Sequence, residues 1–199
     1  MIILRPPILD AVEAKGFKVF EGEYDLNIIG IRSKNTKAGK FDDVVCVVYK
    51  KNGLWQVESF VATCDPGVYW LKDKKKKGNK KGTAVIVSPG QYRGLWTIDK
   101  HSGRYPALCQ RGICGPVSVW RDANKDDKID RDGKVETGHF SINLHRAHGA
   151  KEVENVGPYS AGCVVLHRSE DLDRILWLAK KQIAHHPKWK TFTFTILDE

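Results

Sequence analysis

The chain contains little sulfur and no long apolar segment. Its 199 residues include one methionine and five cysteines. No apolar run approaches the length that a membrane-spanning helix needs. The first residues, MIILRPPILDAVEAKG, lack the basic start, long apolar core and small-residue cleavage site of a secretory signal. We therefore expect no membrane span and no signal peptide, with synthesis in the cytoplasm.

The cysteines are odd in number and irregularly spaced, which does not suit a disulfide framework. They are Cys46, Cys64, Cys109, Cys114 and Cys163. A chain of this length buries a sizeable core without covalent crosslinks, so we expect reduced thiols. The stretch CQRGIC leaves open one short disulfide loop between Cys109 and Cys114.

Acidic residues are fewer than basic ones. The chain has 33 Lys and Arg against 24 Asp and Glu, a formal charge of +9 and a pI near 9.3. This balance favours an acidic partner, and net charge alone does not choose among nucleic acid, anionic lipid and bacterial wall polymers. The run LKDKKKKGNKKGT, residues 71–83, has no apolar periodicity and predicts a solvated loop. Its alternative role is an electrostatic tether to a polyanion.

Most of the chain has the pattern of β-strands. Stretches rich in Val, Ile, Tyr and Trp are separated by Gly, Pro and Asn-Gly, and VVYKKNGLWQV predicts a hairpin around Asn52-Gly53. PPILDAVEAKGF predicts one helix, and SEDLDRILWLAKKQIAHHP predicts another, with Ser169 as N-cap and Pro187 as its end. We therefore expect residues 1–199 to form a single domain of mainly β (α+β) class with a helix near each end.

The stretch RDANKDDKIDRDGK has the spacing of a calcium-binding loop. Its oxygen-bearing residues at loop positions 1, 3, 5 and 9 are Asp122, Asn124, Asp126 and Asp130. Asp127 replaces the glycine usual at position 6, and Gly133 replaces the bidentate glutamate at position 12. The pattern leaves two interpretations open, a structural Ca²⁺ site and a solvated acidic turn.

Nucleophilic chemistry is indicated by one cysteine and one histidine. Cys163 lies in PYSAGCVV, and His145 lies near the end of the predicted strand SINLHRA, 18 positions earlier. A neighbouring imidazole can accept the proton of a thiol, and main-chain N–H groups near the thiol can hold an oxyanion. Two alternatives stay open, a buried structural cysteine and a zinc site formed by His145, His148, Cys163 and His167.

The stretch NLHRAH…PYSAGCVVLHRSEDL resembles the signature of the L,D-transpeptidase catalytic domain (YkuD-like) family. In that signature a strand ends in a histidine, and a Ser/Thr-His-Gly-Cys motif, a short apolar strand and a capped helix follow one loop later. The resemblance covers residues 138–180. It implies a β-sandwich and a cysteine that attacks the carbonyl between the third and fourth residues of a peptidoglycan stem peptide.

By this resemblance Cys163 is the nucleophile and His145 its base, while Ser160 and Gly162 shape the loop. Two positions depart from the family. Ala161 stands where a second histidine is usual, and the second residue after the cysteine is valine in place of Arg or Asn. These departures leave the preferred reaction, hydrolysis or crosslinking, undecided.

Four further residues are candidates for binding a glycopeptide, namely Tyr92, His101, Tyr105 and His148. Aromatic residues of β proteins also serve simply as core or rim packing, which is the alternative for this set.

Upstream stretches, including ATCDPGVYW, SPGQYRGLW and KHSGRYPALCQ, resemble wall-active proteins encoded by phages. This second resemblance implies a phage-type lysin that acts on the cell wall after release or from a virion. Its partners would be peptidoglycan and anionic envelope polymers, with no nucleic acid expected and no cofactor required. The alternatives are a crosslinking L,D-transpeptidase that uses the same residues and a non-catalytic wall-binding or virion protein.

Overall fold

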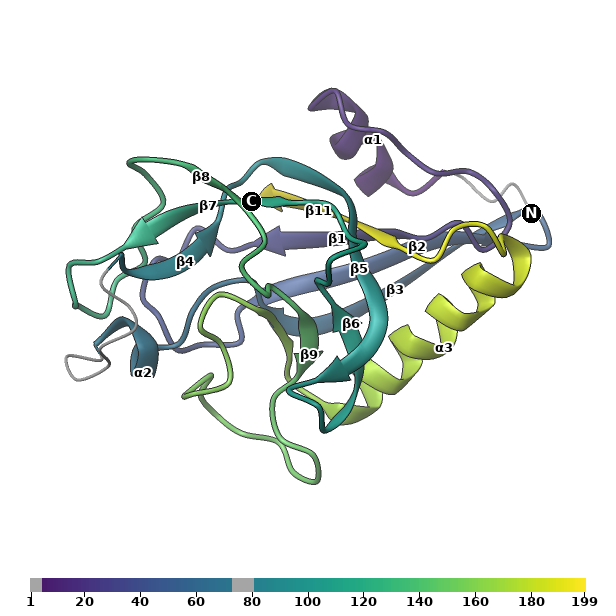
Figure 1. Ribbon diagram of the computed structural model, residues 1–199. Coiled ribbons are helices and arrows are strands. Elements are labelled where there is room, and N and C mark those ends of the chain that lie inside the picture. The colour runs from purple at the N-terminus through teal and green to yellow at the C-terminus, as the bar shows by residue number, and fades with distance from the viewer. Residues whose placement is uncertain (1–4, 73–80) are drawn as a thin grey trace.

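The computed structural model describes residues 5–72 and 81–199 (Figure 1). Strands hold 38% of the chain and helices 16%, which confirms the expected mainly β class with a helix near each end. Of the lysine run KDKKKKGNKK, only Lys72 and Lys81 belong to the described residues. The prediction of a loop or tether at residues 73–80 lies outside them.

Eight strands close into a barrel in the spatial order β1-β11-β5-β6-β9-β10-β3-β2. Their bounds are β1 (Asn27–Arg32), β2 (Asp43–Lys51), β3 (Leu54–Thr63), β5 (Gly90–His101), β6 (Tyr105–Cys109), β9 (Leu144–Arg146), β10 (Val164–Leu166) and β11 (Phe192–Asp198). A separate sheet has the order β4-β7-β8, with β4 (Thr83–Ile86), β7 (Val117–Asp122) and β8 (Glu136–Gly138).

The closed barrel differs from the open sandwich that the family resemblance implied. β9 and β10 have three residues each, and they bridge β6 to β3. Without this bridge the large sheet would end in two unpaired edges, which are costly to expose. The short strands therefore close the barrel, and the three-stranded sheet lies beside it (Figure 1).

The hairpin between β2 and β3 turns where the sequence predicts it. Asn52 and Gly53 have φ values of 53° and 73°, as a two-residue hairpin turn requires. The carboxylate of Glu23 accepts the main-chain N–H groups of both turn residues. The Asn-Gly prediction is confirmed.

The helices are α1 (Pro7–Ala14), the single turn α2 (Val68–Leu71) and α3 (Ser169–His185). Both long predicted helices are confirmed, but α3 begins one residue early: Arg168 occupies the N-cap position, and Ser169 is the first helical residue. Within residues 5–72 and 81–199, no helix has both the length and the apolar character to cross a bilayer.

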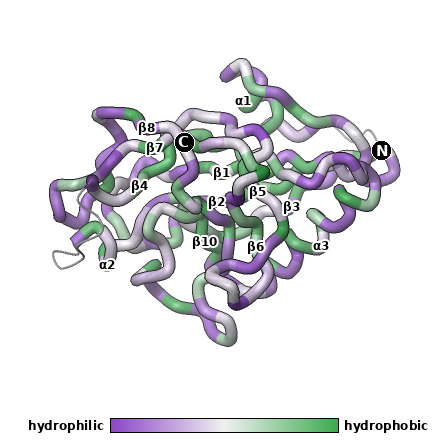
Figure 2. Tube along the Cα trace, viewed as in Figure 1, coloured by the Kyte–Doolittle hydropathy of each residue, from purple (hydrophilic) through white to green (hydrophobic). Residues whose placement is uncertain are grey.

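The main core fills the barrel and continues under α3. Trp96, Phe192 and Phe194 are almost completely buried there, and the Trp96 indole N–H donates to the Ile142 carbonyl at 2.9 Å. Hydrophobic segments concentrate on the strands, whereas the connecting loops are mostly hydrophilic (Figure 2). A second, smaller cluster lies beneath α1, where Leu9 and Val12 are buried.

A buried arginine joins the barrel to the smaller sheet. Arg32, at the end of β1, is fully buried and donates to the Ile86 carbonyl of β4 at 2.8 Å and to the Cys64 carbonyl at 3.2 Å. Its Nε lies 3.2 Å from Asp65 Oδ1, close enough for an ion pair but not aligned for a hydrogen bond. Asp65 also accepts from Arg131 at 2.7 Å. One carboxylate thus contacts two cations, the fully buried Arg32 and the half-buried Arg131.

We expect Arg32→Met to lower the free energy of unfolding by about 3 to 5 kcal/mol, because it removes one partner of a buried ion pair and leaves two carbonyls without a donor. Urea unfolding followed by fluorescence measures this loss. Arg5→Met is the control, since Arg5 pairs with the exposed carboxylates of Asp10 and Glu13 and should lose less than about 1 kcal/mol. Equal losses in the two variants would contradict the assignment.

Candidate active site

The parallel pairing of β9 and β10 brings the two predicted residues to one face of the sheet. Val164 pairs with Leu144 and Val165 with His145, and the Val164 N–H donates to the Asn143 carbonyl at 2.9 Å. Leu144 and Val164 point into the barrel core. Because side chains alternate along a strand, Cys163, Asn143 and His145 share the opposite, outer face.

The outer face of β9 is buried. The sequence SINLHRA alternates Ile142 and Leu144 with polar residues, a pattern that predicts a half-buried strand with one exposed face. His145 is only 2% exposed and Asn143 5%. The β5–β6 hairpin covers this face, since His101 stacks on His145 and the Asn143 amide oxygen accepts from the Gln110 N–H. Both faces of β9 are therefore buried.

The turn before Cys163 is fixed by Ser160 and Gly162. Ser160 is fully buried; its hydroxyl donates to the Cys163 carbonyl at 2.8 Å and accepts from the Gly162 N–H at 3.2 Å. Gly162 has a φ of +121°, and a Cβ there would lie 2.5 Å from the Ala84 carbonyl oxygen. No other residue fits without moving β4. Ser160 therefore acts on the turn and not on a substrate.

The Cys163 thiol sits between main-chain groups of the preceding segment. Its sulfur accepts from the Asn143 N–H at 3.4 Å and donates to the Ser141 carbonyl at 3.6 Å. Burial raises the pKa of Cys163 to about 11, although the Asn143 N–H acts in the opposite direction. The thiol is therefore neutral at neutral pH.

His145 is held in one tautomer. Its Nδ1–H donates to the Arg146 carbonyl at 2.8 Å, which leaves Nε2 as the unprotonated nitrogen. Nε2 is buried and has no hydrogen-bond partner among the described residues. Burial, together with a smaller effect of the nearby His101, lowers the pKa of His145 to about 3. The site thus holds a neutral imidazole with a free acceptor.

The thiol and the imidazole are close but not hydrogen-bonded. Cys163 and His145 lie on adjacent strands, offset by two residues, which corresponds to a Cα separation of about 8 Å. The thiol proton points to Ser141 and not to Nε2. Transfer of the thiol proton to Nε2 would first require the Cys163 side chain to release the Ser141 carbonyl.

Asn143 connects the thiol to the second histidine, and sequence reasoning missed it. Its main-chain N–H contacts the Cys163 sulfur, and its side-chain Nδ2 donates to His101 Nδ1 at 3.0 Å. The His101 ring lies 3.9 Å from that of His145, centroid to centroid. The available signal was a polar residue two positions before His145 on the same strand face.

A cavity of about 200 Å³ opens beside His145. Its lining includes His101, Tyr105 and Tyr159. The Tyr105 hydroxyl lies 3.3 Å from both His145 Nδ1 and the Arg146 carbonyl. Because Nδ1 already carries a proton that bonds this carbonyl, the hydroxyl donates to the carbonyl. His101 and Tyr105, two of the four candidates for binding a glycopeptide, therefore line the cavity beside His145.

The other two groove candidates lie elsewhere. Tyr92 is 8% exposed within the main core, and its hydroxyl donates to the Val87 carbonyl, so its predicted groove role is corrected to packing. His148 lies in the loop after β9, where its Nδ1 accepts from the N–H groups of Ala150 and Lys151. Neither residue lines the cavity beside His145.

The metal and disulfide alternatives can also be compared with the structure. All five cysteines are free thiols, and the Cys114 sulfur contacts the Cys109 carbonyl and not its sulfur. In the part of the chain that the structure describes, no three His, Cys, Asp or Glu side chains form a ready metal group. The His167 Nε2–H donates to the Val153 carbonyl at 2.8 Å, so this nitrogen is not available to bind zinc.

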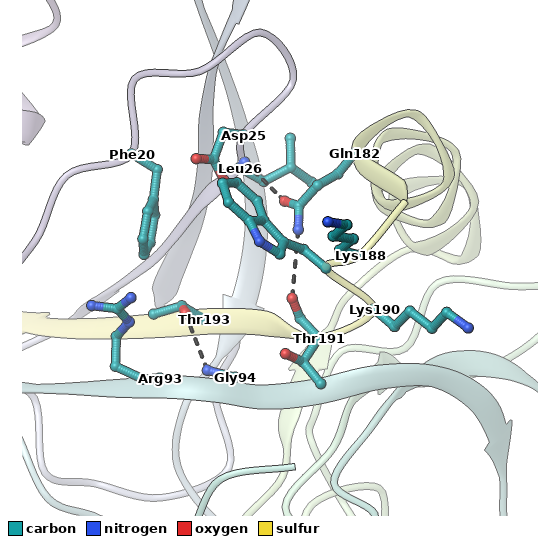
Figure 3. A pocket seen from close by; sticks show the side chains of 11 residues that line it. Phe20, Asp25, Leu26, Arg93, Gly94, Gln182, Lys188, Lys190, Thr191 and Thr193 are labelled. Atoms are coloured by element: carbon teal, nitrogen blue, oxygen red, sulfur yellow. Dashed lines mark hydrogen bonds between the residues drawn. The ribbon is translucent and has the colours of Figure 1, made fainter. Parts of the chain in front are cut away.

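A second cavity, of about 420 Å³, lies at the end of α3 (Figure 3). It receives Arg93 from β5 and Lys188 and Lys190 from the segment before β11. None of these cations forms an ion pair among the described residues, and Arg93 lies over the Phe20 ring at 5.1 Å. Asp25 also lines the cavity, and burial raises the pKa of its carboxyl group. The cavity thus offers unpaired cations beside aromatic surface.

Comparisons of the chain with family models, curated proteins and solved structures return no match. The chemistry of the site is therefore argued from its own residues. It offers a partly exposed thiol, a neutral imidazole with a free nitrogen, and an adjoining cavity. This combination suits acyl transfer.

Iodoacetamide should label Cys163 before the other cysteines, because Cys163 is half-buried and the other four are buried. Since only the thiolate reacts and its pKa is near 11, the rate should rise about tenfold per pH unit from pH 7 to 10. Peptide mass spectrometry of timed samples measures both effects. A rate that is already constant at pH 7 would instead indicate a stable thiolate–imidazolium pair.

Proposed function

We propose that this chain is a cysteine-dependent peptidase of peptidoglycan stem peptides, of the L,D-transpeptidase type. One observation carries the proposal: β9 and β10 place the most accessible thiol, Cys163, on the same face as the unpartnered Nε2 of His145. The sequence resemblance around these residues supplies the substrate class.

In the proposed reaction the Cys163 sulfur attacks the stem-peptide carbonyl carbon while its proton passes to His145 Nε2. The imidazolium gives that proton to the departing amide nitrogen, the C–N bond breaks and a thioester forms. Water then attacks the thioester and loses a proton to His145. The imidazolium returns that proton to the leaving sulfur, which frees the thiol and a product carboxylate.

Burial determines how the proton moves. With a pKa near 11 for Cys163 and near 3 for His145, a separated thiolate–imidazolium pair is strongly disfavoured in the resting site. Proton transfer therefore accompanies the attack, when negative charge moves onto the substrate oxygen. The Gly162 N–H is already bonded to Ser160, so we assign the oxyanion to the N–H of Cys163.

His101 and Asn143 act as positioning residues in this proposal. His101 stacks on the base and Asn143 fixes the ring of His101 by its amide, so the imidazole of His145 is held in one orientation. Tyr105 donates to the same Arg146 carbonyl that fixes the His145 tautomer. These contacts hold the base without adding a charge to it.

The wider role that we propose is that of a phage-type lysin acting on the wall after release or from a virion. The cavity at the end of α3 supports an anionic wall polymer as partner, since Arg93, Lys188 and Lys190 line it, none of them in an ion pair with a described residue, against the single acid Asp25. The 17 residues of α3 span about 25 Å, so this contact lies well away from Cys163.

Incubation of purified walls with the protein, followed by mass spectrometry of the muropeptides, tests the reaction. Cleaved stems that have gained one water are expected for the parent, and none for Cys163→Ala. His145→Gln should lose about 10²- to 10⁴-fold in rate, the usual cost of removing a general base. His148→Gln, altered three residues further along the chain, should retain full activity.

The remaining outcomes separate the alternatives. New crosslinked dimers in place of cleaved stems would identify a transpeptidase that uses the same residues. Walls left chemically unchanged, but bound equally by the parent and Cys163→Ala, would identify a non-catalytic wall-binding protein. Full activity in Cys163→Ala would exclude the proposed nucleophile.

The combined substitution Arg93→Gln, Lys188→Gln and Lys190→Gln should weaken binding to intact walls at low salt, and high salt should weaken the parent similarly because exposed charges are screened. Cosedimentation with walls measures binding. Cleavage of a small neutral muropeptide should be unchanged. The control Lys15→Gln, Lys51→Gln and Lys134→Gln removes three exposed charges elsewhere; equal weakening there would mean a nonspecific effect of net charge.

A further inference from the structure

The connection between β7 and β8 gathers oxygen atoms that the proposed acyl transfer does not use. The Asn124 amide nitrogen donates to Asp126 at 3.1 Å and to Asp130 at 3.0 Å, and the Asp130 N–H donates to Asp122 at 3.0 Å. The residues of loop positions 1, 3, 5 and 9 are therefore in contact around one small volume.

Asp122 is the unusual member of this group. Its side chain belongs to a residue that is 2% exposed, and its Oδ1 is buried without any hydrogen-bond partner among the described residues. Its Oδ2 accepts from Asp130, which directs the carboxyl group toward the loop. A buried carboxylate oxygen without a donor is costly unless a cation completes it.

Asp65 is another buried carboxylate, and cations of the chain itself balance its charge. Asp65 contacts the guanidinium groups of Arg32 and Arg131. By contrast, Asp122, Asp126 and Asp130 form no ion pair with a described lysine or arginine side chain. The acidic loop lacks the compensation that Asp65 receives from within the chain. A bound cation would supply the contact that Asp122 Oδ1 lacks among the described residues.

We propose that this loop binds Ca²⁺ through side-chain oxygens of Asp122, Asn124, Asp126 and Asp130 and the main-chain carbonyl of Lys128. Three carboxylates alone do not form a metal group here, and the other two oxygens are therefore necessary to the site. Position 7 of such loops contributes a carbonyl, which is that of Lys128. Rotation of the Asn124 amide would present oxygen where its nitrogen now bonds Asp126 and Asp130.

The same details set the expected affinity and the choice of ion. Gly133 at position 12 supplies no bidentate carboxylate, so the site should bind in the weak range of about 10⁻⁴ to 10⁻³ M. Mg²⁺ requires strict octahedral geometry and retains its waters, and it should therefore bind far less well to a flexible ring of protein oxygens.

Calcium should stabilise the small sheet and not take part in acyl transfer. Asp122 pairs with Thr83 of β4. The loop also bonds the segment between β1 and β2, where the Ala38 N–H donates to the Asp127 carbonyl and the Thr36 carbonyl accepts from the Ile129 N–H. A ligand that binds only the folded loop raises the unfolding temperature by mass action.

Thermal unfolding of the chelator-treated full chain tests the site. With 10 mM Ca²⁺ the unfolding temperature should rise by about 3 to 10 °C, whereas 10 mM Mg²⁺ should give little change. Asp126→Asn should abolish most of the calcium shift. Asp132→Asn removes the same charge from an exposed position of the same loop and should retain the shift.

Direct calorimetric titration with Ca²⁺ guards against a variant that simply unfolds. One site per chain in the parent and in Asp132→Asn, with at least tenfold weaker binding in Asp126→Asn, supports the proposal. The absence of both heat and stabilisation in the parent would overturn it. Equal weakening in the two variants would also overturn it, since it would show only general attraction of a cation to acidic charge.

Discussion

The buried ion pair of Arg32 with Asp65 is the contact on which the rest of this structure depends. Asp65 holds the guanidinium group of Arg32 at the end of β1, and this group also donates to the Ile86 carbonyl of β4. The smaller sheet is thereby fixed against the barrel. The position of β4 in turn leaves room only for glycine at position 162, because the Ala84 carbonyl lies there. A charge pair that does not contact the thiol thus helps to position the backbone that presents Cys163.

Close packing has a chemical consequence at the site. The outer face of β9 is largely buried, and burial keeps both the thiol of Cys163 and the imidazole of His145 neutral. Low polarity also strengthens a hydrogen bond to any charge that forms during reaction. We therefore expect the Cys163 thiol to be unreactive in the free protein. It should react only when a bound substrate offers an oxygen that can take up negative charge.

The sequence predicts the elements that depend on contacts between neighbouring residues, and it does not predict those that depend on contacts between distant residues. The Asn52-Gly53 hairpin and the two long helices depend on neighbouring residues, and the structure confirms them. Closure of the barrel depends on three-residue strands pairing across long intervals, which periodicity does not reveal. The same limit explains Asn143, whose importance comes from its register beside Cys163, and Tyr92, whose strand face only the closed barrel defines.

The distribution of charge gives the molecule two different ends. The smaller sheet with its acidic loop and the C-terminal end of α3 lie on opposite sides of the barrel (Figure 1). Under the proposals made above, an anionic polymer would be attracted to Arg93, Lys188 and Lys190 and repelled by the acidic loop until calcium offsets its charge. The orientation of the polymer would then depend on both the acidic loop and the cavity at the end of α3. Cleavage would depend on the uncharged Cys163 and His145 between them. Binding to the wall and catalysis can therefore respond to salt and calcium separately.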